Sequence, residues 1–170
     1  MLLQDKGAKL FITKYDDRRK LMSEGLDVII VDDDTSVCEF LSSVINNFYI
    51  WGKVISFSNS DKAINYCIGR EIGVAIFVVD VFLEGISGFS FLDTISQKFP
   101  TAHADSIMIT GNASNDIVNM CIASDIFHLL EKPIKPYTLQ LAVRAIAEKY
   151  LKFAKKLIND TDFAKNVSRF

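Results

Sequence analysis

The chain contains 170 residues, of which 49% are hydrophobic, and it carries a formal net charge of −2. This apolar fraction excludes a disordered chain and supplies enough material for a substantial core. No apolar run approaches the ~20 residues that a membrane-spanning helix requires, and no secretory signal pattern opens the sequence. We therefore expect a cytoplasmic protein of one domain, with extra segments at both ends and no membrane partner.

The positions of the charged residues and of the cysteines indicate which kinds of binding site the chain can contain. Acidic side chains outnumber basic ones in residues 27–146, whereas basic side chains are in excess in residues 1–26 and 147–170. An acidic middle favours a cation site over a nucleic-acid surface, so we expect no direct nucleic-acid binding. Cys38, Cys67 and Cys121 form no CxxC pair and are predicted to be buried, reduced thiols.

Residues 1–26 are predicted to form an N-terminal extension that contains a short amphipathic helix. Its apolar side would be lined by Leu10, Phe11, Tyr15, Leu21 and Met22. From Asp27 onward, apolar runs predict strands over residues 28–31, 54–57, 74–79, 107–109 and 126–130. Helical patterns follow them: one after Asp34 with a capping box of Ser36 and Glu39, then residues 61–68, 89–99 and 114–123, and a long last helix from Tyr137.

This alternation of strands and helices defines the fold class. It predicts a parallel sheet with helices on both faces, and the unbroken apolar run over residues 74–79 is typical of a strand buried on both sides. Right-handed crossovers favour the doubly wound, flavodoxin-like arrangement with strand order 2-1-3-4-5. We therefore predict an α/β fold with helical extensions at its N- and C-terminal ends.

Polar side chains follow four of the predicted strands, at the edge where ligands bind in such sheets. The first strand is followed by Asp32 and Asp33, the third by Asp80, the fourth by Thr110 and the fifth by Lys132. Three carboxylates are expected to converge at the switch point, where their repulsion calls for a cation. Carboxylate oxygens suit Mg²⁺, and a hydroxyl and an ammonium can hold phosphoryl oxygens. The pattern predicts metal-assisted phosphoryl transfer to a carboxylate nucleophile.

The same set resembles the receiver domain of bacterial two-component response regulators. The pair Asp32-Asp33, then Asp80, Thr110 and Lys132-Pro133 occur in the family's order and at similar separations within residues 27–147. Gly88, eight residues after Asp80, also resembles the family's loop. Taken singly these residues have ordinary structural explanations, because an acid can simply end a strand or cap a helix, as we expect of Asp34. As a set they favour a functional site over separate structural roles.

The resemblance implies a role for each residue. Asp80 would accept a phosphoryl group from a sensor histidine kinase, a phosphotransfer protein or a small phosphodonor, with Mg²⁺ as cofactor. The metal ligands would be Asp32, Asp33, Asp80 and the backbone carbonyl of Phe82. Thr110 would bind a phosphoryl oxygen and shift inward, Lys132 would neutralise charge, and the Lys132-Pro133 bond would be cis. The chain would be a switch without turnover of a separate substrate, acting through the surface of its fourth and fifth strands and the helices after them.

Three positions depart from the family pattern. Glu84 stands where many members have a proline, and Leu129 occupies a place where an aromatic side chain commonly moves with activation. Phe82, two residues after Asp80, lies where the family's side chain influences attack of water on the acyl phosphate. Because phenylalanine cannot orient a water molecule, we predict slow self-dephosphorylation.

The last helix continues beyond the expected end of the domain at residue 147. Its apolar positions are spaced 4-3-4-3-4, which is a 3.5-residue repeat that indicates a helix partner; they are Leu139, Val143, Ile146, Tyr150, Phe153 and Leu157. The partner would be a second copy of the chain or the segment of residues 10–22. Residues 148–170 are predicted to be an extension that packs, with a frayed or truncated tail from Asn159 onward. The chain is either a stand-alone regulator or the receiver part of a longer one.

Two other classes of protein compete with the receiver domain. A haloacid-dehalogenase-like phosphatase would use Asp32 as nucleophile and Asp34 as acid and base, with Thr110 and Lys132 as its second and third motifs. That family requires a further acidic pair at a strand end after the lysine, whereas Asp160 and Asp162 of this sequence lie in a polar tail. The phosphatase hypothesis also leaves Asp80 without a role. A receiver-like binding module that never takes phosphate is disfavoured by the complete set of site residues.

Overall fold

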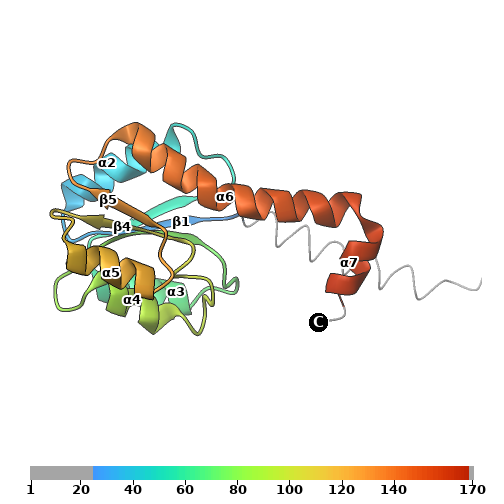
Figure 1. The fold of residues 1–170 in the computed structure, drawn as a ribbon, viewed down its shortest axis with the longest axis horizontal. Helices are drawn as coiled ribbons and strands as arrows, with labels where there is room; N and C mark the ends of the chain where they lie inside the picture. The colour runs from blue at the N-terminus through green and yellow to red at the C-terminus, as the bar shows by residue number, and fades with distance from the viewer. Residues whose placement is uncertain (1–24, 169–170) are drawn as a thin grey trace, which may run out of the picture.

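The computed structural model describes residues 25–168, and the predicted helix around residues 10–22 lies outside this range. Figure 1 shows a sheet with helices on both faces and one long helix that runs beyond it. The five strands are parallel in the order β2-β1-β3-β4-β5, which confirms the predicted doubly wound fold. The strands are β1 (Val28–Val31), β2 (Val54–Phe57), β3 (Ile76–Asp80), β4 (Ser106–Thr110) and β5 (His128–Glu131). The helices are α2 (Thr35–Asn46), α3 (Ser60–Ile68), α4 (Gly88–Ile95), α5 (Asn115–Ala123), α6 (Pro136–Asn159) and α7 (Thr161–Val167).

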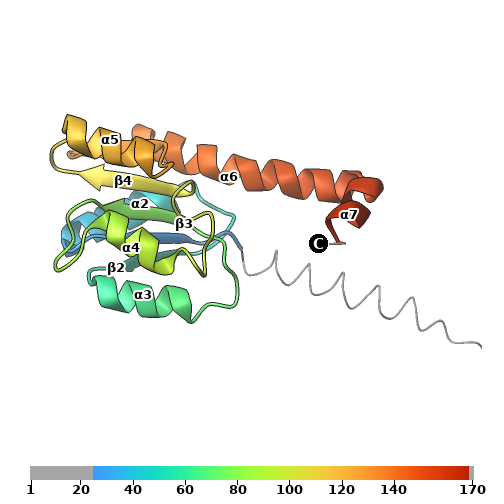
Figure 2. The ribbon, with the colours of Figure 1, turned by 60° about the horizontal axis from the view of Figure 1, so that its bottom comes forward.

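The core forms two layers because successive residues of a strand point to opposite faces. On one face Ile29, Phe77 and Met108 pack with α3, α4 and α5. On the other, Ile30 and Val78 pack with α2 and α6, an arrangement visible in Figures 1 and 2. The strands β1, β3 and β4 are buried at every residue. All three cysteines are buried and free, as predicted.

Several predicted boundaries shift for identifiable reasons. The third strand begins at Ile76 rather than Val74, because the first residue of β1, Val28, pairs with Ile76. The capping box that we assigned to Ser36 is wrong: Asp34 is the N-cap of α2, and its carboxylate accepts hydrogen bonds from the amide and hydroxyl of Ser36 at 2.8 and 2.6 Å. Asp34 is thus a helix-start residue, as expected.

The C-terminal extension is folded, which corrects the prediction of a frayed tail from Asn159. Helix α6 has 24 residues, and Asp160 caps both its end and the start of α7. Helix α7 turns downward from the end of α6 in Figure 1. The Phe163 ring lies 5.9 Å from the Phe153 ring, and Lys156 Nζ lies 4.3 Å from the centroid of the Phe163 ring. Phe153 nevertheless remains 47% exposed. Within residues 25–168, no helix combines the length and apolarity needed to cross a membrane.

A buried carboxylate binds two side chains of α6 near the point where this helix extends beyond the sheet. Asp105 directly precedes β4 and is fully buried. Its carboxylate accepts a hydrogen bond from Lys149 Nζ at 2.5 Å and another from the Tyr150 hydroxyl. Burial and the neighbouring Asp105 raise the pKa of Tyr150 to about 12. The direction of α6 is therefore fixed by polar contacts as well as by packing.

Candidate functional site

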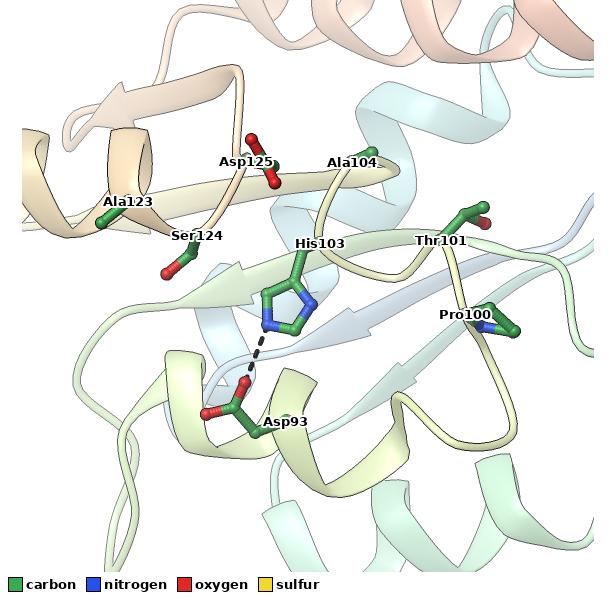
Figure 3. A pocket seen from close by; sticks show the side chains of 8 residues that line it. All are labelled: Asp93, Pro100, Thr101, His103, Ala104, Ala123, Ser124 and Asp125. Atoms are coloured by element: carbon green, nitrogen blue, oxygen red, sulfur yellow. Dashed lines mark hydrogen bonds and ion pairs between the residues drawn. The ribbon is translucent and has the colours of Figure 1, made fainter.

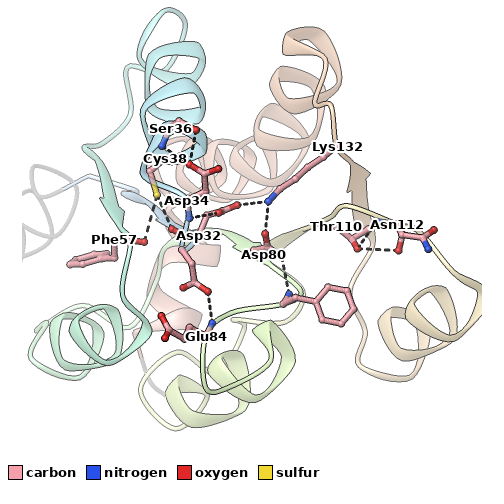
Figure 4. Close-up of polar contacts among 12 residues, drawn as sticks. Asp32, Asp34, Ser36, Cys38, Phe57, Asp80, Glu84, Thr110, Asn112 and Lys132 are labelled. Carbon is pink, nitrogen blue, oxygen red and sulfur yellow. Dashed lines mark hydrogen bonds and ion pairs between the residues drawn. The ribbon is translucent and has the colours of Figure 1, made fainter.

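The parallel sheet brings three of the predicted site residues into direct contact at its carboxyl edge. Asp32 follows β1, Asp80 ends β3, and Lys132 follows β5. Lys132 Nζ lies 2.8 Å from Asp32 Oδ2 and 2.5 Å from Asp80 Oδ2, so one ammonium bridges two buried carboxylates (Figure 4). The second oxygen of each carboxylate accepts a backbone amide: Asp34 N at 2.9 Å for Asp32, and Phe82 N at 2.8 Å for Asp80.

The electrostatics of this triad leave an excess of negative charge. Burial raises the pKa of Asp32, the hydrogen bond from Lys132 opposes that rise, and the nearby charge of Asp80 adds to it. Burial acts to lower the pKa of Lys132, but the hydrogen bonds to Asp32 and Asp80 outweigh burial and leave this pKa above its ordinary value. One ammonium therefore serves two buried carboxylates, and the remaining negative charge favours a further cation.

Asp33 does not join this cluster. It is exposed, and its Oδ2 accepts a hydrogen bond from the backbone amide of Glu84 in the loop after β3. A proline at position 84 would have no N–H to donate, so the departure from the family pattern supplies this contact. Over the described residues, no three His, Cys, Asp or Glu side chains are grouped as a metal site. The expected convergence of three carboxylates therefore holds for two: Asp32 and Asp80 share the Lys132 ammonium, whereas Asp33 accepts the Glu84 amide.

Thr110 lies at the same edge, but its hydroxyl faces the following loop. It donates to the carbonyl oxygen of Asn112 at 3.1 Å and accepts from the amide of Asn112 at 3.2 Å. Figure 4 shows these two residues turned toward each other and apart from the Asp80–Lys132 contact. The carbonyl of Thr110 accepts from the amide of Lys132 at 2.8 Å, and the Lys132-Pro133 bond is cis.

The remaining predicted positions surround the site. Gly88 opens α4 so close to β3 that a Cβ there would lie 2.3 Å from the carbonyl oxygen of Asp80, which explains the absence of a side chain. The side chain of Phe82 is 67% exposed beside the site. Leu129 is half-buried and packs against the core on the α3–α4–α5 face.

Three contacts at the site had no signal in the sequence. The Cys38 thiol donates to the backbone carbonyl of Asp32 at 3.2 Å, behind the acidic pair. Asn112 engages the Thr110 hydroxyl, as described above. Glu131 Oε1 accepts from the amide of Ala113 at 3.1 Å. Each depends on how a loop folds back on a strand end, which residue spacing does not encode.

A separate hollow lies at the opposite edge of the sheet, by the residues that lead into β4 and β5 (Figure 3). It contains the pair His103 Nε2 and Asp93 Oδ1 at 2.9 Å. Its lining residues are Asp93, Pro100, Thr101, His103, Ala104, Ala123, Ser124 and Asp125. None of the predicted site residues belongs to it, so the two features are independent.

Comparison with known proteins agrees with this geometry. The response regulator receiver domain family matches residues 28–144. Among curated proteins, "Two-component response regulator-like PRR37" of Oryza sativa subsp. japonica is 24% identical over 122 residues, which cover 72% of this chain and 16% of that protein. "Cyclic di-GMP phosphodiesterase response regulator RpfG" of Xanthomonas campestris pv. campestris is 29% identical over 119 residues, covering 68% and 30%. The chain spans a third or less of the length of the curated relatives it matches.

Solved structures share the fold. The beryllofluoride-activated NtrC4 receiver domain dimer has a TM-score of 0.63 and 24% identity, and the match covers 73% of this chain and 98% of that one. Chemotaxis protein CheY4 of Vibrio cholerae has a TM-score of 0.62 and 18% identity, covering 72% and 98%. At these identities the likeness concerns the fold alone. The family match spans more than half of the sequence, and with it the chain belongs to the response regulator receiver domains.

Proposed function

We propose that this receiver domain is a phospho-accepting switch in which Asp80 takes a phosphoryl group from a histidine kinase or a phosphotransfer protein. The observation that carries the proposal is the contact of Asp32 and Asp80 with the single ammonium of Lys132 at the carboxyl edge of the sheet. A carboxylate held at a strand end beside a fixed cation is placed to attack phosphorus.

The proposed reaction uses the groups already in place. An Asp80 carboxylate oxygen attacks the phosphorus of the donor, the new O–P bond forms an acyl phosphate, and the electron pair of the broken bond leaves with the donor. Lys132, in contact with Asp80 Oδ2, neutralises charge on the phosphoryl oxygens. Thr110 would donate its hydroxyl proton to one of these oxygens after leaving Asn112. The exchange of hydrogen-bond partners by Thr110 is the conformational step of the switch.

The donor set fits Mg²⁺ in its chemistry. The carboxylates of Asp32, Asp33 and Asp80 and the backbone carbonyl of Phe82 would hold the metal, and all of them offer hard oxygen atoms. The excess negative charge described above favours the same ion. When bound, Mg²⁺ would supply additional positive charge for the transferring phosphoryl group. Asp33 would then exchange its hydrogen bond from Glu84 for the metal.

The proposed output surface lies on α5, β5 and α6. Large apolar side chains are exposed there: Val118 and Ile122 of α5, Phe127 directly before β5, and Tyr137 and Leu141 of α6. Leu129 is half-buried against the core and is not aromatic, so the signal would pass through the loop after β4 rather than through a moving aromatic ring. We further propose a cytoplasmic location and no turnover of a separate substrate by the chain itself.

The second half of the apolar repeat of α6, which runs from Leu139 to Leu157, is a further candidate binding surface. Leu139, Val143 and Ile146 are buried in the domain core. Beyond them the apolar repeat leaves the sheet, and α7 covers Phe153 only in part. We propose that this stretch binds another helix, from a second copy of the chain or from residues 10–22. Size-exclusion chromatography with light scattering, compared with a chain truncated before residue 25, separates these two arrangements.

The phosphatase alternative is weaker than the receiver. Asp34, its acid and base, is engaged with Ser36 as the cap of α2, and the family match and the relatives favour a receiver.

Intact mass after incubation with acetyl phosphate and Mg²⁺ tests the proposal. We expect a phosphate-sized gain in the wild type and in Asp34→Asn, which serves as the matched control, and no gain in Asp80→Asn. A gain that survives Asp80→Asn but is lost in Asp32→Asn would contradict the assignment of the acceptor.

A further inference from the structure

The loop between β4 and α5, residues 111–114, controls which way the Thr110 hydroxyl faces. Both hydrogen bonds of that hydroxyl go to the backbone of Asn112. To reach a phosphoryl oxygen on Asp80, as the proposed function requires, Thr110 must release Asn112, and the loop must then change conformation. Whatever holds the loop in its present conformation therefore also opposes activation.

A side chain from the neighbouring strand holds this loop. Glu131 is the last residue of β5 and lies beside Thr110 in the strand register. Its Oε1 accepts the backbone amide of Ala113 at 3.1 Å. The residue after it, Lys132, donates its own amide to the carbonyl of Thr110 at 2.8 Å. The end of β5 thus holds both the end of β4 and the loop that follows β4.

Packing contributes little to the hold on this loop. Gly111, Asn112 and Ala113 are exposed. A Cβ added at Gly111 would meet no heavy atom of the described chain within 4 Å. Ala113 precedes the N-cap residue Ser114, so its amide takes no part in the hydrogen bonds of α5. The polar contacts from Thr110 and Glu131 are therefore the local restraints on the loop.

We propose that Glu131 is a positioning residue that holds the loop after β4, and with it the Thr110 hydroxyl, away from Asp80 in the unphosphorylated domain. Phosphorylation would require the Glu131–Ala113 hydrogen bond to break or lengthen as Thr110 turns inward. Loss of the Glu131 acceptor would raise the fraction of molecules in which the loop has already released Thr110. This inference rests on the proposed function, because it takes Asp80 as the acceptor and Thr110 as its partner.

The prediction distinguishes the hydrogen bond from the charge. Glu131→Ala removes the acceptor, whereas Glu131→Gln keeps a carbonyl oxygen at the same place and removes only the charge. A ligand that needs the active conformation binds more tightly when that conformation is populated more often. We expect Glu131→Ala to bind beryllofluoride, in the presence of Mg²⁺, roughly two- to fivefold more tightly than the wild type, since the bond is exposed to water. Glu131→Gln should match the wild type.

Titration of the full chain with beryllofluoride, followed by NMR, measures these affinities and also reports the Ala113 amide directly. Hydrogen exchange at Ala113 should accelerate in Glu131→Ala and remain unchanged in Glu131→Gln. Glu71→Ala, which removes an exposed carboxylate between α3 and β3, is the matched control and should leave both readouts unchanged. Thermal unfolding of each variant checks that a changed affinity does not reflect a changed fold.

The outcomes separate the two levels of inference. If the wild type binds beryllofluoride and Glu131→Ala binds it with the same or a weaker affinity, the role of Glu131 alone is overturned. Equal tightening in Glu131→Ala and Glu131→Gln assigns the effect to charge and also overturns it. A wild type that takes up no beryllofluoride overturns the proposed function and, with it, the part played by Glu131.

Discussion

The buried carboxylate of Asp105 should stabilise the domain far more than an exposed carboxylate does. Asp105 is fully buried, and Lys149 and Tyr150 both donate to it. A hydrogen bond to a charged acceptor contributes about 1.5–3 kcal/mol, and this range applies to the partly buried Tyr150 hydroxyl. The Lys149 side chain is 53% exposed, so solvent screening limits its share to at most ~1 kcal/mol.

Removal of the carboxylate also has a compensating effect. A buried charge carries a desolvation penalty, and Asp105→Ala abolishes that penalty together with the hydrogen bonds. Tyr150 keeps a second neighbour in Thr101, at 3.3 Å between the two hydroxyl oxygens. Both points move the estimate toward its lower end. We therefore expect Asp105→Ala to lower the free energy of unfolding by about 2 kcal/mol.

Urea unfolding of the full chain at pH 7, followed by circular dichroism, measures this loss. Asp93→Ala is the matched control, because Asp93 pairs with His103 but its side chain is 73% exposed. We expect the control to change stability by less than ~0.5 kcal/mol. Equal losses in the two variants, or an Asp105→Ala loss below ~0.5 kcal/mol, would refute the reasoning from burial.

Three further predictions concern single side chains. Gly88→Ala should destabilise the fold by about 2 kcal/mol in urea, since its Cβ would overlap the carbonyl oxygen at the end of β3, whereas Gly111→Ala should be nearly neutral; similar losses for both would contradict this. Because the pKa of Tyr150 is raised to about 12, the folded state keeps the phenol proton above pH 10 where the unfolded state loses it, so stability falls as pH rises through that window. Tyr150→Phe should show a shallower fall than the wild type, because the buried Tyr49, whose pKa burial also raises, still contributes to it. The exposed Tyr137→Phe should follow the wild type, and parallel pH profiles of all three proteins would argue against the assignment. Because Phe82 cannot orient a water molecule, the acyl phosphate of the wild type should be long-lived, and Phe82→Asn should shorten its lifetime roughly tenfold. Loss of the phosphoryl label from the wild type within seconds would contradict this prediction.

The fold and the positions of the site residues could be predicted because both follow from strand ends. The apolar run before Asp80 and the shorter one before Asp32 each predict a buried parallel strand. In a parallel sheet all carboxyl ends meet at one edge, so sequence order alone brings Asp32, Asp80 and Lys132 together. The strand register then decides the contacts, and it is set by the same alternation of side chains that fills the two cores.

The orientation of side chains at that edge could not be predicted. Asp33 bonds to the amide of Glu84, and Thr110 bonds to Asn112. These choices depend on side-chain torsions and loop conformations that differ by a few kcal/mol at most, and no periodic pattern reports them. Helix α7 was missed for another reason, because its seven residues are too short for a periodic apolar signal. The acidic cap at Asp160 was the one local indication of it.

The arrangement of the site explains how a switch can operate without disturbing the core. The unphosphorylated edge is held by a few polar contacts: Lys132 with its two carboxylates, Asp33 with Glu84, Thr110 with Asn112, and Glu131 with Ala113. Each can be exchanged for a contact to a metal, a phosphoryl oxygen or water at small net free energy, because one hydrogen bond replaces another. The strands beneath are buried at every residue of β1, β3 and β4, and repacking them would be far more costly. A phosphoryl group on the proposed acceptor Asp80 would therefore move loops over a rigid sheet, and we expect the loop after β4 to be the path from the site to the apolar side chains of α5.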